Sequence, residues 1–548
     1  MAIERPDAGP AAHDAHDWAT FPSKLIILCF VRTYVSAIRL YQEMKVFEGD
    51  PHVKLVWVRC PGSKLEDPLS DWLLGKGIRV IPYEEAKKSR RDLIVTTSEW
   101  IDPIPFAPTP VIVIPHGLGF HKYVRDPHTG RYRLAGLARP EGLRTKQVTQ
   151  VVTHEDQVRQ LAEASPHTIG RTALGGCSDF DLLTNSRGER PDYREALGVS
   201  SDQRLVVVSS TWGPDSLFAR RPELIDRLLA ELPFELYKIA VILHPGVWSI
   251  EGGDEVLRRL SRHIQSGGLM VVPTTEGWHG TLLAADLAIG DNGTVSLQAA
   301  LMDIPLLLGT VSKRVVRGTV MDELCGTARS IDFTGGLRRQ VEDEIGKHDR
   351  SRAERLVRRM IARPGESGSL LRALCYTTAG HTAPDDELPV RTAPLPVPMP
   401  SAAHSFRFHF RIDSAVTGDL YPAHFREKLK HDEERLLVQI GERDHRRHAN
   451  ASVIVDPVPV LPCAVQARLA TLADKHVGCR IVAATCGNGG FEFLVRDGRR
   501  FRVTCDCGMP VRVLAAACYE ILVVERELSG EFVVRTSLGD AKMTVVPL

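Results

Sequence analysis

The sequence predicts an α/β protein with two Rossmann-like domains in tandem, facing each other across a cleft, and a small strand-rich domain after them. Short runs of Val, Ile and Leu alternate with segments of helical spacing, which is typical of parallel strands covered by helices on both faces. The pattern begins again near residue 204, which indicates a second sheet. A Pro-rich stretch at 383–400 then precedes a segment with hairpin signals.

Composition fits a globular protein of several domains. A chain of 548 residues suggests about three domains. With 43% hydrophobic and 25% charged residues it can bury sizeable cores, and its formal net charge of +1 gives no reason to expect a nucleic-acid partner. No apolar run approaches the ~20 residues of a membrane span, so we expect a cytoplasmic protein. The eleven Cys have no regular spacing, which favours free thiols over a disulfide framework.

The first domain is expected at 23–188, after a disordered tail at 1–22. The segment at 36–47, SAIRLYQEMKVF, has the spacing of a helix between the first two strands. The runs expected to form strands are apolar on both faces, as in a doubly wound sheet, and lie at 25–31, 53–58, 78–83, 92–97 and 111–115.

The second domain is expected at 189–378, with a helical, Arg-rich stretch at 338–375 closing it. Its expected strands lie at 205–210, 237–244, 269–273, 287–291 and 305–309. Its expected helices lie at 222–232, 254–265, 278–286 and 295–303.

A linker at 379–403 is expected to be extended and semi-rigid, because it holds six Pro residues. Beyond it, 404–548 is expected to be a β-rich accessory domain that binds a protein partner or an acceptor polymer. Hairpins are expected at 491–505, around Asp497-Gly498, and at 519–537, around Ser529-Gly530.

The Cys residues of this accessory domain raise the question of zinc. Their spacing does not match the paired C-x₂₋₄-C knuckles of structural zinc sites. Buried thiols in a small β domain are therefore the favoured interpretation of Cys479, Cys486, Cys505 and Cys507.

The stretch ADLAIGDNGTVSLQAALMDIPLLLG at 285–309 carries the strongest chemical signal. It reads as a strand, a polar turn and a helix, so unpaired backbone N–H groups and the helix dipole would favour an anion at the turn. Simple capping of the helix is an equally good interpretation, since these residue types commonly cap helices. The candidate phosphate-binding residues are Asp291, Asn292, Gly293, Thr294 and Ser296.

Other predicted strands also end in polar residues. His244 ends a strand just before Pro245, at the edge where open α/β sheets bind ligands. Ser210, Thr211 and Trp212 end another, and could line a cleft or stack on a ring. A turn histidine and a helix start are the alternatives for these stretches.

The segment VIVIPHGLGFHKY at 111–123 ends a strand of the first sheet in His116-Gly117. An imidazole at this edge could accept a proton from an attacking hydroxyl, and glycine lets the backbone pass close to a ligand. Gly117 and Lys122 are therefore candidate cleft-lining residues, and His116 is the candidate base. Taken alone, the stretch is a strand that runs into a turn.

Together and in this order, the four stretches resemble the GT-B glycosyltransferase superfamily. More narrowly they look like the CDP-glycerol glycerophosphotransferases that build teichoic-acid polymers. The family's His-Gly is matched by His116-Gly117, with Lys122 as a loose match to its Lys, and its His-Pro is matched by His244-Pro245. Two further turns are matched in part, by Ser210-Thr211-Trp212 and by Asp291-Asn292-Gly293-Thr294. The fold correspondence covers roughly residues 24–375.

The resemblance implies an inverting transfer from a nucleotide-diphosphate donor to a polyol, glycan or small-molecule acceptor. His116 would be the base, His244 and the helix start at 291–297 would hold the donor diphosphate, and neither cofactor nor metal would be needed. The family is also commonly peripheral to the membrane.

Departures from the family pattern keep other functions open. Asn292 and Gly293 replace Tyr and Ser, and GGCSDFD at 175–181 lacks the family's Arg. A degenerate, non-catalytic binding or scaffold protein is thus an alternative, as is a non-hydrolysing sugar-nucleotide 2-epimerase, although the strand ends offer few carboxylates for it. Trp278-His279-Gly280-Thr281 spells letters that surround the family's first His, and we interpret this match as chance.

Overall fold

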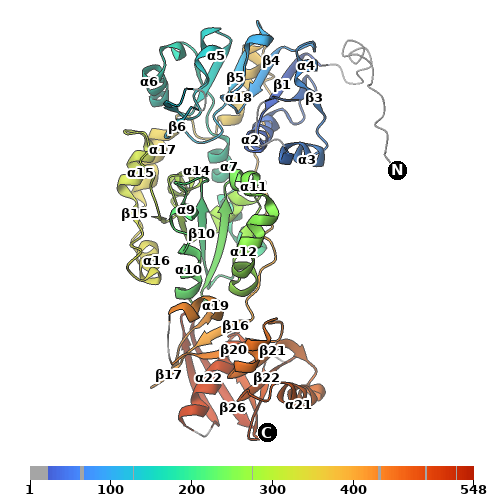
Figure 1. The fold of residues 1–548 in the computed structure, drawn as a ribbon, viewed down its shortest axis with the longest axis vertical. Coiled ribbons are helices and arrows are strands. Elements are labelled where there is room, and N and C mark those ends of the chain that lie inside the picture. Colours follow the sequence, from blue (N-terminus) through green and yellow to red (C-terminus); the bar gives the residue numbers. More distant parts are fainter. Residues whose placement is uncertain are drawn as a thin grey trace, which may run out of the picture.

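The structure is a computed structural model that describes residues 23–61, 67–126, 129–273, 276–429, 433–487, 490–525 and 528–548, with the backbone alone at 67–70. The predicted tail at 1–22 lies outside the described residues. Figure 1 shows a first, a second and a third sheet stacked along the long axis of the molecule, with the second in the middle. Among the helices described, none combines the length and the apolar character that crossing a bilayer requires.

The first sheet is parallel, in the order β3-β2-β1-β4-β5-β8-β9. Alternate residues of its central strand enter opposite cores: Leu28 and Phe30 pack on one face, Ile27 and Cys29 on the other. Its strands are β1 (Leu25–Val31), β2 (Val53–Arg59), β3 (Val80–Pro82), β4 (Leu93–Thr96), β5 (Val111–Val113), β8 (Val148–Val152) and β9 (Thr172–Leu174). The helices around it are α2 (Tyr34–Met44), α3 (Asp67–Gly75), α4 (Tyr83–Ala86), α5 (Pro140–Arg144) and α6 (Glu155–Ala164). The next helix, α7 (Ser178–Asn185), packs through Phe180 and Leu183 into a core of the second domain.

The second sheet is also parallel, in the order β12-β11-β10-β13-β14-β15. Its strands are β10 (Arg204–Ser210), β11 (Tyr237–Leu243), β12 (Met270–Val272), β13 (Leu287–Gly290), β14 (Leu306–Leu308) and β15 (Arg329–Ser330). Its helices are α8 (Arg190–Ala196), α9 (Leu217–Arg220), α10 (Leu224–Glu231), α11 (Pro245–Glu251), α12 (Gly253–Gly267), α13 (Trp278–Ala284), α14 (Thr294–Leu301), α15 (Val320–Thr327), α16 (Leu337–Gly346) and α17 (Ser351–Met360).

The helix α18 (Ser367–Thr378) returns to the first sheet, where Leu371, Cys375 and Tyr376 join one of its cores. Asp181 of α7 fixes the start of α18 by accepting hydrogen bonds from the N–H groups of Gly365 and Ser367, at 2.7 and 2.9 Å. The chain therefore crosses from the second domain back to the first before it reaches the linker.

The Pro-rich stretch at 383–400 is irregular and runs along both domains. Arg391 pairs with Glu48 of the first domain at 2.6 Å, whereas the Ala393 carbonyl accepts a hydrogen bond from Tyr193 of the second domain at 2.9 Å. The stretch is thus a strap held to both domains (Figure 1).

The third sheet is mixed, in the order β17-β18-β25-β26-β24-β23-β22-β21-β20-β16-β19. Its strands are β16 (Ser405–Phe408), β17 (Arg411–Ile412), β18 (Val416–Thr417), β19 (Leu420–Pro422), β20 (Arg435–Gln439), β21 (Val453–Val460), β22 (Ile481–Cys486), β23 (Phe491–Val495), β24 (Arg500–Cys505), β25 (Gly530–Thr536) and β26 (Gly539–Pro547). Its helices are α19 (Ala423–Arg426), α20 (His445–Asn450), α21 (Val465–Lys475) and α22 (Val511–Val524).

The third domain docks on the second at the amino ends of the strands of the second sheet. Phe234, just before β11, packs on Phe406 with ring centroids 5.0 Å apart, and its neighbour Glu235 pairs with Arg512 of α22. The carboxyl ends of the same strands point toward the first domain (Figure 1).

The predicted fold class is confirmed by these sheets, and the predicted hairpin at 491–505 forms as β23 and β24. The hairpin predicted at 519–537 is wrong, because 511–524 is the buried helix α22 and only 530–536 of the described residues there is a strand. The helix contains the strong helix formers Ala515, Ala516 and Ala517. It is buried nearly all round, so its apolar run at 521–524 has the same sequence pattern as a buried strand. The helical stretch predicted at 338–375 forms α16, α17 and α18, but α18 packs on the first sheet instead of closing the second domain.

Candidate active site

The site is built where the second sheet reverses its strand order, between β10 and β13. In open α/β sheets the crevice outside the strand ends at such a point is where ligands bind. The turns after these strands are joined by Asp291, whose Oδ2 accepts hydrogen bonds from the Thr211 N–H at 2.9 Å, the Thr211 hydroxyl at 2.7 Å and the Leu217 N–H at 3.0 Å. Burial raises the pKa of Asp291, against the opposing effect of these hydrogen bonds and of Lys122.

Several candidate phosphate-binding side chains have partners within the protein. The Asn292 Oδ1 accepts a hydrogen bond from the Ser312 N–H at 2.9 Å. Ser296 is buried, and its hydroxyl packs so closely on Gly290 that a Cβ on residue 290 would overlap it. Ser210 is buried too, and its hydroxyl donates to the Thr211 carbonyl at 2.9 Å. These side chains shape the turns from within.

The amino end of α14 faces the first domain. Gly293 is the N-cap residue, and no side-chain hydrogen bond caps the N–H groups of the first turn in the described structure. Thr294 is half-buried and close to Gly117 of the first domain. A Cβ added to Gly117 would lie 3.1 Å from the Thr294 hydroxyl oxygen. Free N–H groups and the helix dipole favour an anion here.

His244 follows β11 and caps α11. Its Nδ1 accepts a hydrogen bond from the Gly246 N–H at 2.9 Å, so the neutral ring carries its proton on Nε2 and can donate from there. Burial lowers the pKa of His244 to about 3, with further contributions from the positive charges of His116 and Lys122. Trp212 stacks on the ring at 6.2 Å between centroids and is about half exposed.

His116 follows β5 on the first domain and remains partly exposed. Its Nδ1 lies 3.8 Å from Oε2 of Glu99, a buried carboxylate that comes just after β4. That distance is too long for a hydrogen bond, and Nδ1 is the ring nitrogen on the side of the carboxylate. Glu99 was not among the residues predicted from the sequence.

The loop that carries His116 bridges the two domains. The Tyr123 N–H donates to the Arg314 carbonyl at 2.9 Å, and the Val316 N–H donates to the His121 carbonyl at 2.8 Å. The backbone of Lys122 pairs with that of Val315 in an isolated antiparallel β-bridge. The segment then continues into the short hairpin of β6 (Tyr123–Arg125) and β7 (Tyr132–Leu134).

The basic side chains of this loop are desolvated. Burial lowers the pKa of Lys122, against the attraction of Asp291 and Asp215. Burial also lowers the pKa of His121 to about 4, although its Nδ1 contacts the Leu118 carbonyl at 2.9 Å. Lys122 of the first domain thus acts electrostatically on Asp291 and on His244 of the second.

An open groove of about 910 Å³ lies beside this bridge. It holds one carboxylate, Asp215, which already pairs with Arg220 at 2.9 Å and contacts Arg314 at 3.4 Å. The other side chains named here are basic or aromatic: Tyr123, Tyr132, Arg221 and Lys313.

A buried charged cluster fixes the boundary of the domains behind the site. Asp179 of α7 pairs with Arg39 of α2 at 2.5 Å and with His279 of α13 at 3.0 Å, and Arg39 also pairs with Glu43 at 2.6 Å. Burial alone would raise the pKa of Asp179, but Arg39 and His279 bring it down to about 2. The histidine of the WHGT stretch therefore contacts the carboxylate of an interdomain charged cluster.

Two signals in the sequence could have found the missed residues. Glu99 lies just after a predicted strand, where carboxylates of an α/β sheet reach the ligand edge. Arg39 and Glu43 are spaced i,i+4 on a helix with apolar neighbours, which indicates a buried pair. Their partner Asp179 is far along the chain, and no local pattern reveals it.

No known protein family and no curated protein matches the sequence. Among solved structures, the chain is similar to a variant of the wall teichoic acid polymerase TagF, with 12% identity, 65% of this chain and 89% of that chain covered and a TM-score of 0.45. It is also similar to a glycosyltransferase from Rickettsia africae (12%, 65% and 98%, 0.37) and to the UDP-GlcNAc 2-epimerase of Neisseria meningitidis bound to UDP-GlcNAc (12%, 63% and 98%, 0.40). These values are low, and the residues of the site carry the functional inference.

Proposed function

We propose that the chain is a GT-B type transferase that moves a glycosyl or glycerophosphate group from a nucleotide-activated donor to an acceptor hydroxyl. The observation that carries this proposal is the approach of Gly117 to Thr294 across the domain boundary. It places the segment that carries His116, a partly exposed imidazole, next to the amino end of α14. A base and an anion-binding helix end on opposite sides of one site are what such a transfer needs.

His116 is the proposed base. With Nδ1 held toward Glu99, its Nε2 is free to take the proton of the acceptor hydroxyl, whose oxygen then forms the new bond. The carboxylate 3.8 Å away stabilises the imidazolium that results. Glu99 is thus a positioning residue, since it acts through the ring.

The donor diphosphate is proposed to lie at the amino end of α14. The N–H groups of its first turn, the Thr294 hydroxyl and the Nε2–H of neutral His244 all supply donors to the leaving phosphate as the bond to the transferred group breaks. Asp291, Asn292 and Ser296 support this site by fixing the turns rather than by touching the phosphate. The exposed face of Trp212 suits stacking on a ring of the donor.

The acceptor is proposed to approach through the 910 Å³ groove. Its arginines, Lys313 and exposed tyrosines suit an acceptor that carries phosphates or many hydroxyls. The third domain, docked at the opposite end of the second sheet, is proposed to bind a protein partner or the acceptor polymer rather than to take part in the chemistry.

The test is a screen of CDP, UDP and GDP and their activated donors by thermal shift, followed by a transfer assay with the best binder. His116→Ala should keep donor binding and lose at least about 100-fold in turnover, the lower range for a general base. The exposed His381 provides the matched control, and His381→Ala should leave both unchanged.

Two outcomes would overturn the proposal in favour of the alternatives. Binding without turnover on any acceptor tested would indicate a non-catalytic binding protein. Epimerised donor formed in the absence of an acceptor would indicate a 2-epimerase.

A further inference from the structure

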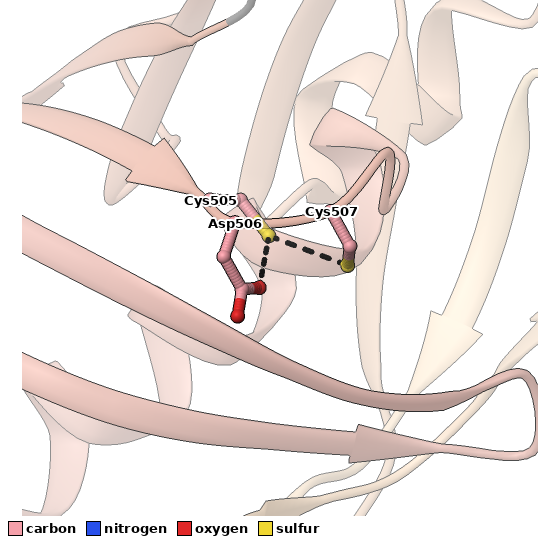
Figure 2. A group of neighbouring side chains, drawn as sticks. All are labelled: Cys505, Asp506 and Cys507. Carbon is pink, nitrogen blue, oxygen red and sulfur yellow. Dashed lines mark hydrogen bonds between the residues drawn. The ribbon is translucent and has the colours of Figure 1, made fainter.

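The turn between β24 and α22 in the third domain gathers sulfur and oxygen donors that the site above does not use. Its sequence is Cys505-Asp506-Cys507, with Cys505 half-buried and the other two residues exposed. Figure 2 shows both thiols and the carboxylate on the same side of the turn. One ligand atom from each residue lies within 4.8 Å of the others.

The separation of the thiols matches a known metal geometry. The Sγ atoms of Cys505 and Cys507 are 3.7 Å apart. A tetrahedral zinc ion with Zn–S bonds of about 2.3 Å holds two sulfurs about 3.8 Å apart. Linear coordination at the same bond length would need a separation of about 4.6 Å. The pair is therefore spaced for a tetrahedral ion, with the Asp506 oxygen 3.9 Å from the Cys505 Sγ (Figure 2).

The turn is fixed to the neighbouring strand before any metal binds. The Lys542 N–H of β26 donates to the Asp506 Oδ1 at 2.9 Å, and the Asp506 N–H donates to the Lys542 carbonyl at 3.2 Å. Cys505 itself is paired with Met543 in the sheet. Holding the donors in place in this way lowers the ordering that metal binding would require.

Cys479 and Cys486 do not complete a four-thiol site with this turn in the described structure. Cys479 is buried, and its thiol contacts the Ile481 carbonyl at 2.9 Å. Cys486 is buried as well, and its thiol faces the Ala484 carbonyl at 3.9 Å. The prediction of buried thiols thus fits these two residues. Cys505 and Cys507 differ from them, because Cys505 is only half-buried, Cys507 is exposed, and their thiols lie next to each other.

We propose that Cys505, Asp506 and Cys507 form a binding site for a zinc-class divalent cation. Two thiolates and a carboxylate are ligands that zinc takes in proteins. Within the described part of the chain this cluster supplies three donors, which leaves the fourth position to water or to a donor from another molecule. The site would lie at the end of β24, beside β26, in the domain proposed to bind partners.

The test uses the full chain, untagged, reduced with a non-thiol reductant and freed of metal by a chelator. Zinc is then added in competition with a chromophoric chelator, and cobalt is added separately as a spectroscopic probe. The wild type should bind one zinc per chain, and its cobalt form should show a thiolate-to-cobalt absorption band in the near ultraviolet. Cys507→Ser should lose the band and weaken zinc binding by more than the 10–100-fold that loss of an outer-shell partner costs.

Cys463 provides the matched control, because it is exposed and lies outside the cluster. Cys463→Ser should keep both the stoichiometry and the band, and far-ultraviolet circular dichroism should show that each variant is folded. The proposal is overturned if the reduced wild type takes up no zinc, or if Cys507→Ser and Cys463→Ser bind zinc equally well.

Discussion

Thr211 and Asp291 join the central strands of the second sheet through a single carboxylate oxygen. Thr211 donates its N–H and its hydroxyl to Oδ2 of Asp291, at 2.9 and 2.7 Å, and both residues stand at the strand ends next to α14. The Asp291 carboxylate, at the start of the predicted phosphate-binding turn, therefore accepts hydrogen bonds from the protein itself. It determines where the N–H groups of α14 point, which is how it contributes to the proposed donor site.

Removing this carboxylate should destabilise the protein. Asp291→Ala leaves the buried N–H of Leu217 and the partly buried N–H of Thr211 without an acceptor, and a buried group in this state costs about 1–3 kcal/mol. Thr211→Val removes one hydroxyl and should cost about 1 kcal/mol. Asp291→Asn keeps an oxygen acceptor and should fall between the wild type and Asp291→Ala in a thermal-melting series. Equal melting temperatures for Asp291→Ala and Thr211→Val would contradict this role.

Space at the N-cap of α14 should limit residue 293 to glycine. A Cβ on Gly293 would stand 2.6 Å from Cγ2 of Thr211, although its φ of −90° suits any residue. Gly293→Ala should therefore cost about 1–3 kcal/mol through overpacking and weaken nucleotide binding. Thr211→Ser keeps the hydroxyl and removes the methyl group, so the double variant should recover part of the lost melting temperature. A double variant no better than Gly293→Ala would indicate that another contact is responsible.

The buried cluster at the domain boundary should be sensitive to loss of its cation. Arg39→Ala leaves Asp179 and Glu43 buried without their main partner, a change that costs roughly 3–5 kcal/mol in comparable pairs. The exposed pair Arg535–Asp540 offers a control, since solvent screens it and Arg535→Ala should leave the melting temperature nearly unchanged. Similar melting temperatures for the two variants would show that the cluster does not hold the domains together.

Stability should fall as the pH drops below 6.5. The folded-state pKa values of His121, about 4, and His244, about 3, lie below the ordinary value of 6.5, because burial disfavours the charged rings. The unfolded chain therefore binds protons that the folded chain does not. The stability is complete above pH 6.5 and is lost toward pH 4, by up to about 1.4 kcal/mol per pH unit and group.

The variant His121→Asn tests this pH dependence. It should flatten the dependence of the melting temperature between pH 6.5 and 4, because the new side chain does not titrate. His381→Asn, at an exposed position, should leave the slope as it is in the wild type. A slope that both variants share with the wild type would contradict the contribution of His121.

The strands of both parallel sheets could be predicted because their chemistry is local. Leu28 and Ile27 enter opposite cores, so a strand such as β1 must be apolar at every position. An unbroken apolar run of this kind can be recognised in the sequence. The helix α22 shows the limit, since a helix that is apolar nearly all round has no periodicity to separate it from a buried strand.

Side-chain direction at the site could not be predicted. Asp291, Asn292 and Ser296 are residue types that serve equally as ligands and as internal hydrogen-bond partners, and only the fold decides between these uses. Contacts between distant segments were also hidden: the pairing of Asp179 with Arg39 joins residues 140 positions apart. The return of α18 to the first sheet has the same origin, since its apolar face would fit either domain.

The most direct test of the proposed site is a crystal structure of the chain with the nucleoside diphosphate that raises its melting temperature most. The proposal predicts phosphate oxygens within hydrogen-bond distance of the first-turn N–H groups of α14 and of His244 Nε2, with the His116 ring facing them from the first domain. A diphosphate bound away from α14, or the absence of binding by any nucleotide tested, would contradict it.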